Sequence, residues 1–340
     1  MPFISVIVTA HNRREYLRDA VDSVLNQTID DYEIIVVKNF KDEIDDYLKE
    51  NGVKSVLVGD QTQGMDVISG LKEARGEVIS FLDDDDLFLP RKLEKVKEVF
   101  QDDNVGHYHN AYENFLDKTP NNLDKIHIKK DYDYTIIDNQ EKVKKFKFMM
   151  NTETEINSSS ISIRRSLFNN SFSYLEKINH AVDVFMFYLA LMSEKKIVVD
   201  PEVLTLYRIH SNNTWFYMND DFENWLEHKK SYMEKEIEDY ITMLNMIKSS
   251  SFEIFIKEYI LDLKLRLARL PSPYNNSKYK ATIKDYIAYY NRYKSLRSLL
   301  SNLTAFTPSF IRRKLVKKWY QDERSSQEKI VQVSKIKNST

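Results

Sequence analysis

The chain has 340 residues, of which 42% are hydrophobic, so we expect a main folded domain with an appendage rather than a disordered chain. Its formal net charge of -2 argues against a general nucleic-acid-binding surface, and the absence of cysteine excludes disulfides and thiolate metal sites. With no long uncharged apolar stretch and no basic leader before the first predicted strand, we expect a soluble or peripheral cytoplasmic protein without a cleaved export signal.

The first 106 residues contain all six glycines and alternate between short apolar strands and amphipathic helices. Strands are predicted at 4–9, 33–37, 55–58 and 78–82, and helices at 13–26, 42–50, 65–74 and 91–100. Strands and helices that alternate with short links are typical of a parallel sheet with right-handed crossovers. Ligands of such sheets bind at the carboxyl ends of the strands. Residues 9–12, 38–39 and 83–86 all fall there.

The rest of the chain is less regular up to about residue 220 and helical beyond it. Residues 107–151 are polar and aromatic, and we interpret them as a variable insertion of strands and loops. The further predictions are strands at 157–164 and 198–209, and helices at 182–192, 225–247, 252–270 and 279–300. The predicted division is a domain of residues 1–218 and a helical C-terminal region of residues 219–340.

Four consecutive aspartates, Asp83 to Asp86, follow the apolar run 78–82. Adjacent carboxylates repel one another, so their position at the end of a buried strand predicts a cation, and we interpret the site as one for a divalent metal that carries a diphosphate. The alternative is a solvated acidic turn. The buried strand before the run and Pro90 after it favour the metal site.

Several segments together resemble the GT-A family 2 glycosyltransferases. They are Ser5-Val-Ile-Val-Thr-Ala-His-Asn-Arg13, Leu17 to Gln27, Phe81-Leu-Asp-Asp-Asp-Asp-Leu-Phe-Leu-Pro90, Asp183, and Tyr207-Arg-Ile-His210. The resemblance spans about residues 3–215 in consistent order. It implies a Rossmann-like α/β fold with a mostly parallel central sheet, and the inverting transfer of a sugar from a nucleotide donor with the help of Mg²⁺ or Mn²⁺.

The resemblance also assigns roles to residues at the predicted site. Asp85 would be the main metal ligand, with Asp86 in support, while Asp83 and Asp84 would lie towards the ribose and base of the donor. Asp83 is also a candidate metal ligand. Asp183 would be the base that deprotonates the acceptor hydroxyl, although an acid at a helix start is also a common capping residue.

Other residues are candidates for contact with the donor. His210 would contact the metal or the diphosphate, and Arg208 would contact the phosphates. The alternative for His210 is a structural role, which is common for a lone histidine. The remaining donor-binding candidates are Thr9, Ala10, His11, Asn12, Asn39 and Arg75. For Arg75 a simple turn at the end of a helix explains the sequence almost as well. Arg13 is interpreted as either a donor contact or only the beginning of a solvated helix.

One segment departs from the family pattern. Acidic residues followed by Gly-Ser usually come after the second strand, whereas this chain has Val37-Lys-Asn-Phe40. Because an acid there would accept hydrogen bonds from the base, the nucleotide stays open, with a UDP-sugar as the first choice. No Gln-x-x-Arg-Trp segment of processive synthases is found, which favours transfer of a single sugar.

The C-terminal segment 306–320 alternates basic residues with Ile311, Leu315, Val316, Trp319 and Tyr320. Such a segment can lie on an anionic bilayer, at the inner face of the membrane, which would make a lipid-linked acceptor plausible alongside a glycan. The alternative is a helix packed on its own domain. The helical region could also form a homo-oligomer.

Two other functions compete with sugar transfer. A sugar nucleotidyltransferase would need a glycine-rich phosphate loop after the first strand, and residues 9–14 contain no glycine. A non-catalytic protein that binds a nucleotide sugar or acts as a scaffold would keep the same fold. Replacement of Asp183 would distinguish such a protein from an enzyme, because only an enzyme would lose sugar transfer while it still bound the donor.

Overall fold

The computed structural model describes residues 1–116, 118–120, 122–210, 213, 221–294 and 296–337. The chain divides into two compact units, Met1–Ile209 and His210–Thr340. The predicted boundary at residue 218 falls within residues 214–220, outside the described part. Within the described part, no helix has the length and apolar character needed to cross a bilayer.

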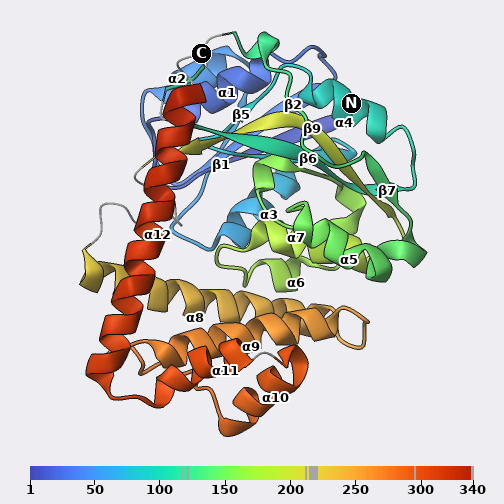
Figure 1. The fold of residues 1–340 in the computed structure, drawn as a ribbon. Coiled ribbons are helices and arrows are strands. Elements are labelled where there is room, and N and C mark those ends of the chain that lie inside the picture. The colour runs from blue at the N-terminus through green and yellow to red at the C-terminus, as the bar shows by residue number, and fades with distance from the viewer. Residues whose placement is uncertain (117, 121, 211–212, 214–220, 295, 338–340) are drawn as a thin grey trace. The chain divides into compact units, whose positions relative to one another are not determined.

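The first unit is built on a nine-stranded sheet in the order β3-β2-β1-β4-β8-β6-β9-β5, with β7 paired to β9 (Figure 1). The strands are β1 (Ile4–Ala10), β2 (Tyr32–Lys38), β3 (Lys54–Leu57), β4 (Val78–Asp83), β5 (Leu87–Phe88), β6 (Val105–Leu116), β7 (Thr135–Ile137), β8 (Ile161–Arg164) and β9 (Lys196–Ile209). In the parallel register of β1, β2 and β4, Thr9 lies opposite both Val37 and Asp83. The ends of these three strands therefore meet at one edge.

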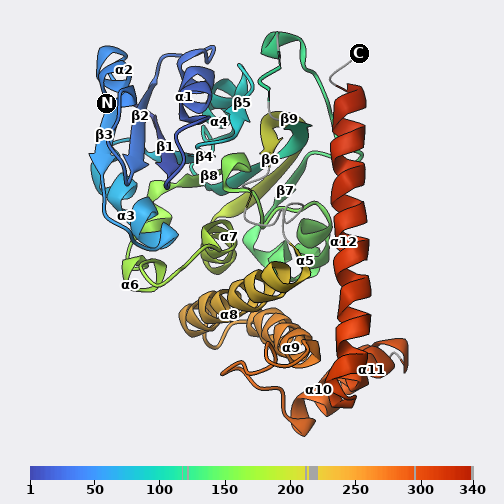
Figure 2. The same cartoon turned by 90° about the vertical axis from the view of Figure 1, so that its left-hand side faces the viewer.

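Helices cover both faces of this sheet (Figure 2). They are α1 (Leu17–Leu25), α2 (Ile44–Glu50), α3 (Gln63–Glu73), α4 (Lys92–Val99), α5 (Lys142–Asn151), α6 (Phe172–Leu175) and α7 (Val182–Met192), with short 3₁₀ turns η1 (Leu123–Lys125), η2 (Asn139–Glu141), η3 (Ser158–Ser160) and η4 (Arg165–Phe168). Alternate residues of β1 point to opposite faces, so that Val6 and Val8 join one core with α1, α2 and α4.

On the other face, α3 packs closely against β1 through a glycine. A Cβ added to Gly70 would come within 2.6 Å of the Ile7 side chain. A larger residue would therefore push α3 away from the sheet. This close packing fixes α3 beside the strand ends that carry the candidate site.

The structure confirms the α/β class and corrects several details. The sheet is mixed, because β8 runs antiparallel to both β4 and β6. The stretch interpreted as an insertion instead supplies the long central strand β6 and the helix α5. The expected strand at 157–164 begins as the turn η3, and the expected helix at 279–300 is two helices, since Lys294 takes a left-handed conformation (φ 45°).

The second unit is helical. Its elements are α8 (Phe222–Met246), α9 (Glu253–Arg269), α10 (Ile283–Tyr293), α11 (Leu296–Leu303), the turn η5 (Thr304–Phe306) and α12 (Ser309–Lys337). The buried Trp225 packs edge-on against Trp319, with ring centroids 5.0 Å apart. Of the segment 306–320, Val316 and Tyr320 are thus part of this core, whereas Phe310 is exposed.

Candidate active site

The four aspartates lie at the carboxyl edge of the sheet, where β4 ends. Asp84, Asp85 and Asp86 are buried and Asp83 is half-buried. Carboxylate oxygens of Asp83, Asp85 and Asp86 lie within 4.8 Å of one another. One oxygen of Asp84 and one of Asp86 are buried without a hydrogen-bond partner in the described structure. Buried carboxylate oxygens this close together form a donor set that suits a hard divalent cation.

The electrostatics of this cluster favour the same conclusion. Burial, together with the charge of Asp85, raises the pKa of Asp83 to about 6. Burial also raises the pKa of Asp84 to about 7 and that of Asp86 well above its ordinary value. These carboxyl groups hold their protons tightly until a positive charge offsets the repulsion.

Part of that positive charge comes from Arg13, which follows β1. Its Nε donates to Asp84 at 2.9 Å, and its Nη1 lies 2.8 Å from an oxygen of Asp85. Burial opposes the charged form, but the attraction of the carboxylates outweighs it and raises the pKa of Arg13 beyond its ordinary value. The structure thus places Arg13 at the site. Arg13 does not begin a solvated helix, because α1 begins only at Leu17.

A second buried basic residue, Arg208, holds the turn that carries the aspartates. The Arg208 backbone N–H donates to Asp86 at 3.0 Å, and its Nε donates to the Asp85 carbonyl at 2.7 Å. Its guanidinium also pairs with Asp19, so Arg208 fixes the turn in this structure, and its contact with the donor phosphates stays a prediction. Lys92, which no motif in the sequence indicated, is also buried and donates to Asn110 at 2.8 Å, and burial lowers the pKa of its amino group well below the ordinary value.

The turn η3 connects the aspartates to Asp183. Ser158 donates a hydrogen bond of 2.9 Å to Asp83, and the Asp83 backbone N–H donates to Ser159 at 3.0 Å. The backbone N–H of Asn157 donates to one oxygen of Asp183 at 2.9 Å, and that of Val184 to the other at 2.8 Å. The run of small polar residues 157–160 was the signal available in the sequence for these contacts.

Asp183 is the second residue of α7, and its carboxyl group has a raised pKa. Burial raises its pKa to about 7, and the charge of Asp83 adds to this shift. Burial also raises the pKa of Glu155 to about 7. The charge of the nearby Asp183 makes a smaller contribution to this shift. One oxygen of Glu155 is buried without a hydrogen-bond partner in the described structure. Asp183 thus has a neighbouring acid of similarly raised pKa, Glu155, which was missed from the sequence.

The candidates for nucleotide contact gather after β1 and β2. Asn39 accepts a hydrogen bond from the Asn12 backbone at 2.8 Å, and its amide donates to the Asn12 side chain at 3.0 Å. His11 lies 3.2 Å from Asp60 and 3.9 Å from Asp66. Acids that follow β3 in the chain are thus found beside His11, although residues 37–40 at the end of β2 include none. Thr9 and Ala10 end β1 at the same edge.

Lys38, where the family usually has an acid, points away from this group. Its side chain is buried and pairs with Asp45 at 2.9 Å and with the Phe40 carbonyl at 2.6 Å. The departure in sequence is therefore accommodated inside the fold by α2.

One predicted donor contact, Arg75, is not brought to this group. Arg75 pairs with Glu33 at 2.8 Å, and Glu33 lies opposite Ser5 near the start of β2. Arg75 is therefore at the amino end of the strands, the opposite edge from the aspartates, and its assignment to the donor is wrong. His210 is buried and begins the second unit, and its role at the diphosphate stays a prediction.

Residues 5–172 match the model of the family described as Glycosyl transferase family 2. An uncharacterized glycosyltransferase of Nostoc sp. (strain PCC 7120) is 38% identical over 109 residues, which are 30% of this chain and 34% of that protein. The chain spans about a third of the length of the curated relatives that it matches first.

Two solved structures share the fold. The crystal structure of S. aureus TarS in complex with UDP has a TM-score of 0.54 at 14% identity and covers 95% of this chain and 92% of its own. Mannosyltransferase PcManGT from Pyrobaculum calidifontis, in complex with GDP-Man and Mn²⁺, has a TM-score of 0.52 at 14% identity and covers 99% and 87%.

The mixed sheet, its flanking helices and the acidic strand end define the first unit as a GT-A domain. Within this domain, residues 5–172 match the family 2 glycosyltransferases.

Proposed function

We propose that the protein is an inverting glycosyltransferase that moves a single sugar from a nucleotide-diphosphate donor to a hydroxyl group of a glycan, glycolipid or lipid-linked acceptor. The observation that carries the proposal is the linkage through η3 of the Asp83, Asp85 and Asp86 cluster to Asp183. This linkage supports a diphosphate site and a base that lie next to each other and are joined through η3.

The donor diphosphate requires a divalent cation in this proposal, either Mn²⁺ or Mg²⁺. Asp85, Asp83 and Asp86 would hold it, and the unpartnered buried oxygen of Asp86 supports that fit. When bound, the cation offsets the negative charge that develops on the leaving diphosphate. Arg13 holds Asp84 and Asp85 in place beside the cluster, and Arg208 fixes the turn.

Asp183 acts as the general base. Its two oxygens accept backbone hydrogen bonds from Asn157 and Val184, which fix the orientation of the carboxyl group. A pKa of about 7 allows it to take a proton from the acceptor hydroxyl near neutral pH. In an inverting transfer the hydroxyl oxygen attacks the anomeric carbon on the face opposite the diphosphate while Asp183 accepts the hydroxyl proton.

A UDP-sugar is our proposed donor. TarS was solved with UDP, which supports a uridine nucleotide, although PcManGT was solved with GDP-Man. His11, Asn12 and Asn39 form the polar group that would face the base, with Asp66 near His11. The cytoplasmic location, contact with the inner face of a membrane and homo-oligomer formation are further proposals that depend on the second unit.

The test is a donor screen with and without Mn²⁺, read as release of nucleoside diphosphate. We expect slow hydrolysis of one nucleotide sugar by the wild-type protein and faster turnover with a hydroxyl acceptor. Asp183→Asn should lower transfer by at least about 100-fold while donor binding persists, because general-base catalysis contributes factors of this order. Wild-type turnover in Asp183→Asn would remove this residue from the mechanism. Donor binding without turnover in the wild type would favour a non-catalytic protein.

A further inference from the structure

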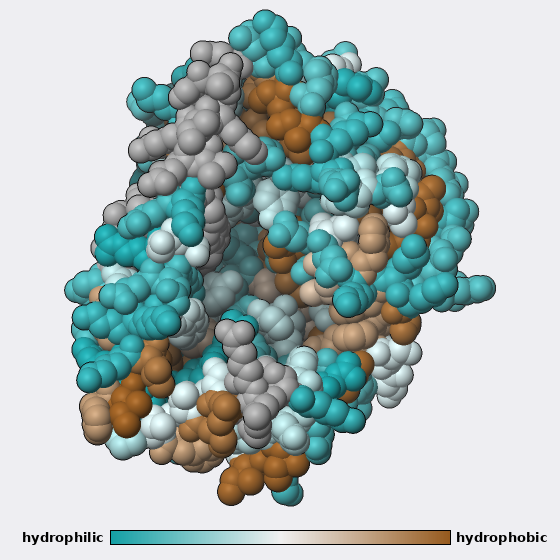
Figure 3. All heavy atoms as spheres, viewed as in Figure 1, coloured by the Kyte–Doolittle hydropathy of each residue, from teal (hydrophilic) through white to brown (hydrophobic). Residues whose placement is uncertain are grey.

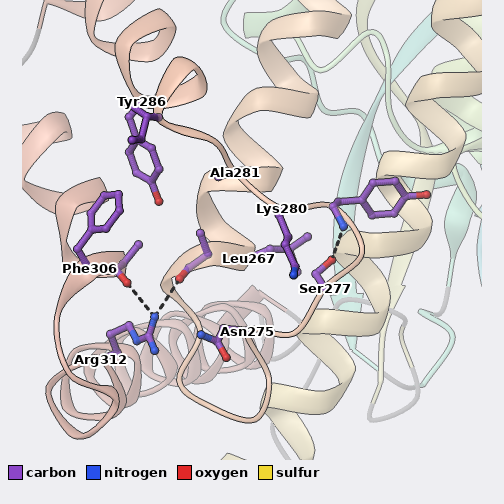
Figure 4. A pocket seen from close by; sticks show the side chains of 12 residues that line it. Leu267, Asn275, Ser277, Lys280, Ala281, Tyr286, Phe306 and Arg312 are labelled. Carbon is purple, nitrogen blue, oxygen red and sulfur yellow. Dashed lines mark hydrogen bonds between the residues drawn. The ribbon is translucent and has the colours of Figure 1, made fainter.

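The second unit contains two adjoining cavities near the C-terminal end of α9. The first has a volume of about 250 Å³ and is lined by polar groups that include Asn275, Lys280 and Arg312 (Figure 4). The second has a volume of about 340 Å³ and is lined by aliphatic and aromatic side chains that include Ile287 and Leu303. Ile283, Tyr286 and Phe306 line both cavities. A polar cavity thus opens directly onto an apolar one.

The polar cavity carries positive charge. Lys280 and Arg312 line it, and none of the described residues that line it is acidic. The Arg312 Nη1 donates to the Ala305 carbonyl at 2.8 Å, which holds the guanidinium in the cavity wall. Its Nε is buried and has no hydrogen-bond partner within the described residues. A buried donor of a fixed guanidinium is suited to an anionic oxygen ligand.

Several apolar side chains that line the second cavity are exposed to solvent. Ile283 is 72% exposed, Ile287 55% and Phe306 64%. In the space-filling view, hydrophobic surface lies at the lower edge, over α10 (Figure 3). Contiguous apolar surface of this kind marks an interaction site.

We propose that these two cavities bind one anionic membrane lipid, with its phosphate against Lys280 and Arg312 and its hydrocarbon chain along Ile287, Leu303 and Phe306. An amphiphile satisfies both cavities at once, because its anionic and apolar parts are covalently joined as the cavities are joined through Tyr286. A peptide helix would bury the apolar surface but would leave the acid-free cationic cavity without a partner. The proposal does not depend on sugar transfer.

The test measures binding of the full chain to vesicles of phosphatidylcholine with and without phosphatidylglycerol. We expect tighter binding to the vesicles that contain phosphatidylglycerol. Lys280→Gln should weaken this binding about fivefold, since a basic residue at such a surface contributes about 1 kcal/mol. Ile287→Ser should weaken binding to a similar extent. Lys280 and Ile287 are exposed, so both variants are expected to fold.

Matched controls lie at the other end of α9. Lys248→Gln removes an exposed charge, and Ile254→Ser removes an apolar side chain that is 48% exposed. Both should bind vesicles as the wild type does. Equal effects of Lys248→Gln and Lys280→Gln, or equal binding to both vesicle types, would overturn the proposal.

A soluble competition experiment separates a lipid from a free phosphate. Decyl phosphate should displace the protein from vesicles at concentrations at which inorganic phosphate does not. Equal competition by the two compounds would show that the apolar cavity is not used, and would overturn the lipid assignment.

Discussion

Asp183 and Glu155 are two acids whose pKa values are both raised to about 7, mainly by burial, and the charge of Asp183 adds to the shift of Glu155. Because such a coupling is reciprocal, the charge of Glu155 also disfavours ionisation of Asp183. An acid of raised pKa is protonated below that value and becomes a base above it. The proton-accepting form of Asp183 therefore increases as the pH rises through about 7. The raised pKa of Asp183 therefore predicts how kcat/KM depends on pH.

For the wild type, kcat/KM is expected to increase with pH, with a midpoint near 7. Glu155→Gln removes a neighbouring negative charge, so it should move the midpoint to lower pH and leave the fold intact. The measurement is the pH dependence of kcat/KM for both proteins. The matched change Glu194→Gln, at an exposed position after α7, should leave the midpoint unchanged. An unmoved midpoint in Glu155→Gln would contradict the coupling.

The aspartate cluster makes a second prediction at this scale, on stability. Because the pKa values of Asp83 and Asp84 are raised to about 6 and 7, the folded protein binds more protons than the unfolded chain between about pH 4 and 7. The free energy of unfolding contributed by the cluster therefore falls as the pH rises through that window. Asp86→Asn removes one of the repelling charges.

In the presence of a chelator, the Tm of Asp86→Asn should exceed that of the wild type by more at pH 8 than at pH 5. The expected gain is a few degrees, since ~1 kcal/mol shifts the Tm of a domain of this size by roughly 2–4 °C. Addition of Mn²⁺ at pH 8 should raise the Tm of the wild type more than that of the variant. A Tm difference that is the same at both pH values would refute the electrostatic account.

At the scale of elements, the site depends on the turn between β4 and β5 and on its contacts with β9 and η3. Arg208 from β9 holds the Asp85 carbonyl and the Asp86 carboxylate, and Ser158 holds Asp83. Each carboxylate is thus oriented by a group from another element. Residues that orient metal ligands affect metal affinity almost as strongly as the ligands do.

Arg208→Lys should weaken Mn²⁺ binding by roughly 10-fold to 100-fold, because lysine cannot reproduce the fork of donors that reaches the Asp85 carbonyl and Asp19. Titration calorimetry with Mn²⁺ measures the change. Arg75→Lys is the matched control, since Arg75 lies at the opposite edge of the sheet and should have no effect. Equal losses in the two variants would show that Arg208 has no specific role.

The accuracy of the sequence predictions for these elements follows from their periodicity. β1, β4 and α7 were predicted within a residue of their bounds because their apolar patterns are continuous. The strand β6 was missed because it carries buried polar residues, among them His107 and Asn110, which mask the pattern of a central strand. Its position is determined by pairing with β8 and β9, which are distant in sequence.

At the scale of the whole molecule, the chain combines a GT-A domain with a separate helical unit. The position of residues 83–86 at the carboxyl edge of the sheet was predictable, because they directly follow the apolar strand 78–82. The sequence left the role of Arg13 open and gave no sign of Glu155, since the importance of both appears only in contacts made across the fold. The cavity around Arg312 was likewise hidden, as it joins segments about 40 residues apart.

The central claim is that the edge of the sheet at Asp83 to Asp86 binds a metal and a nucleoside diphosphate together. The most direct measurement is calorimetric titration of UDP into the wild type and into Asp85→Asn, each with Mn²⁺ or with a chelator. The account predicts UDP binding that needs Mn²⁺ in the wild type and falls by at least about tenfold in Asp85→Asn. UDP binding of equal affinity in all four titrations would contradict it.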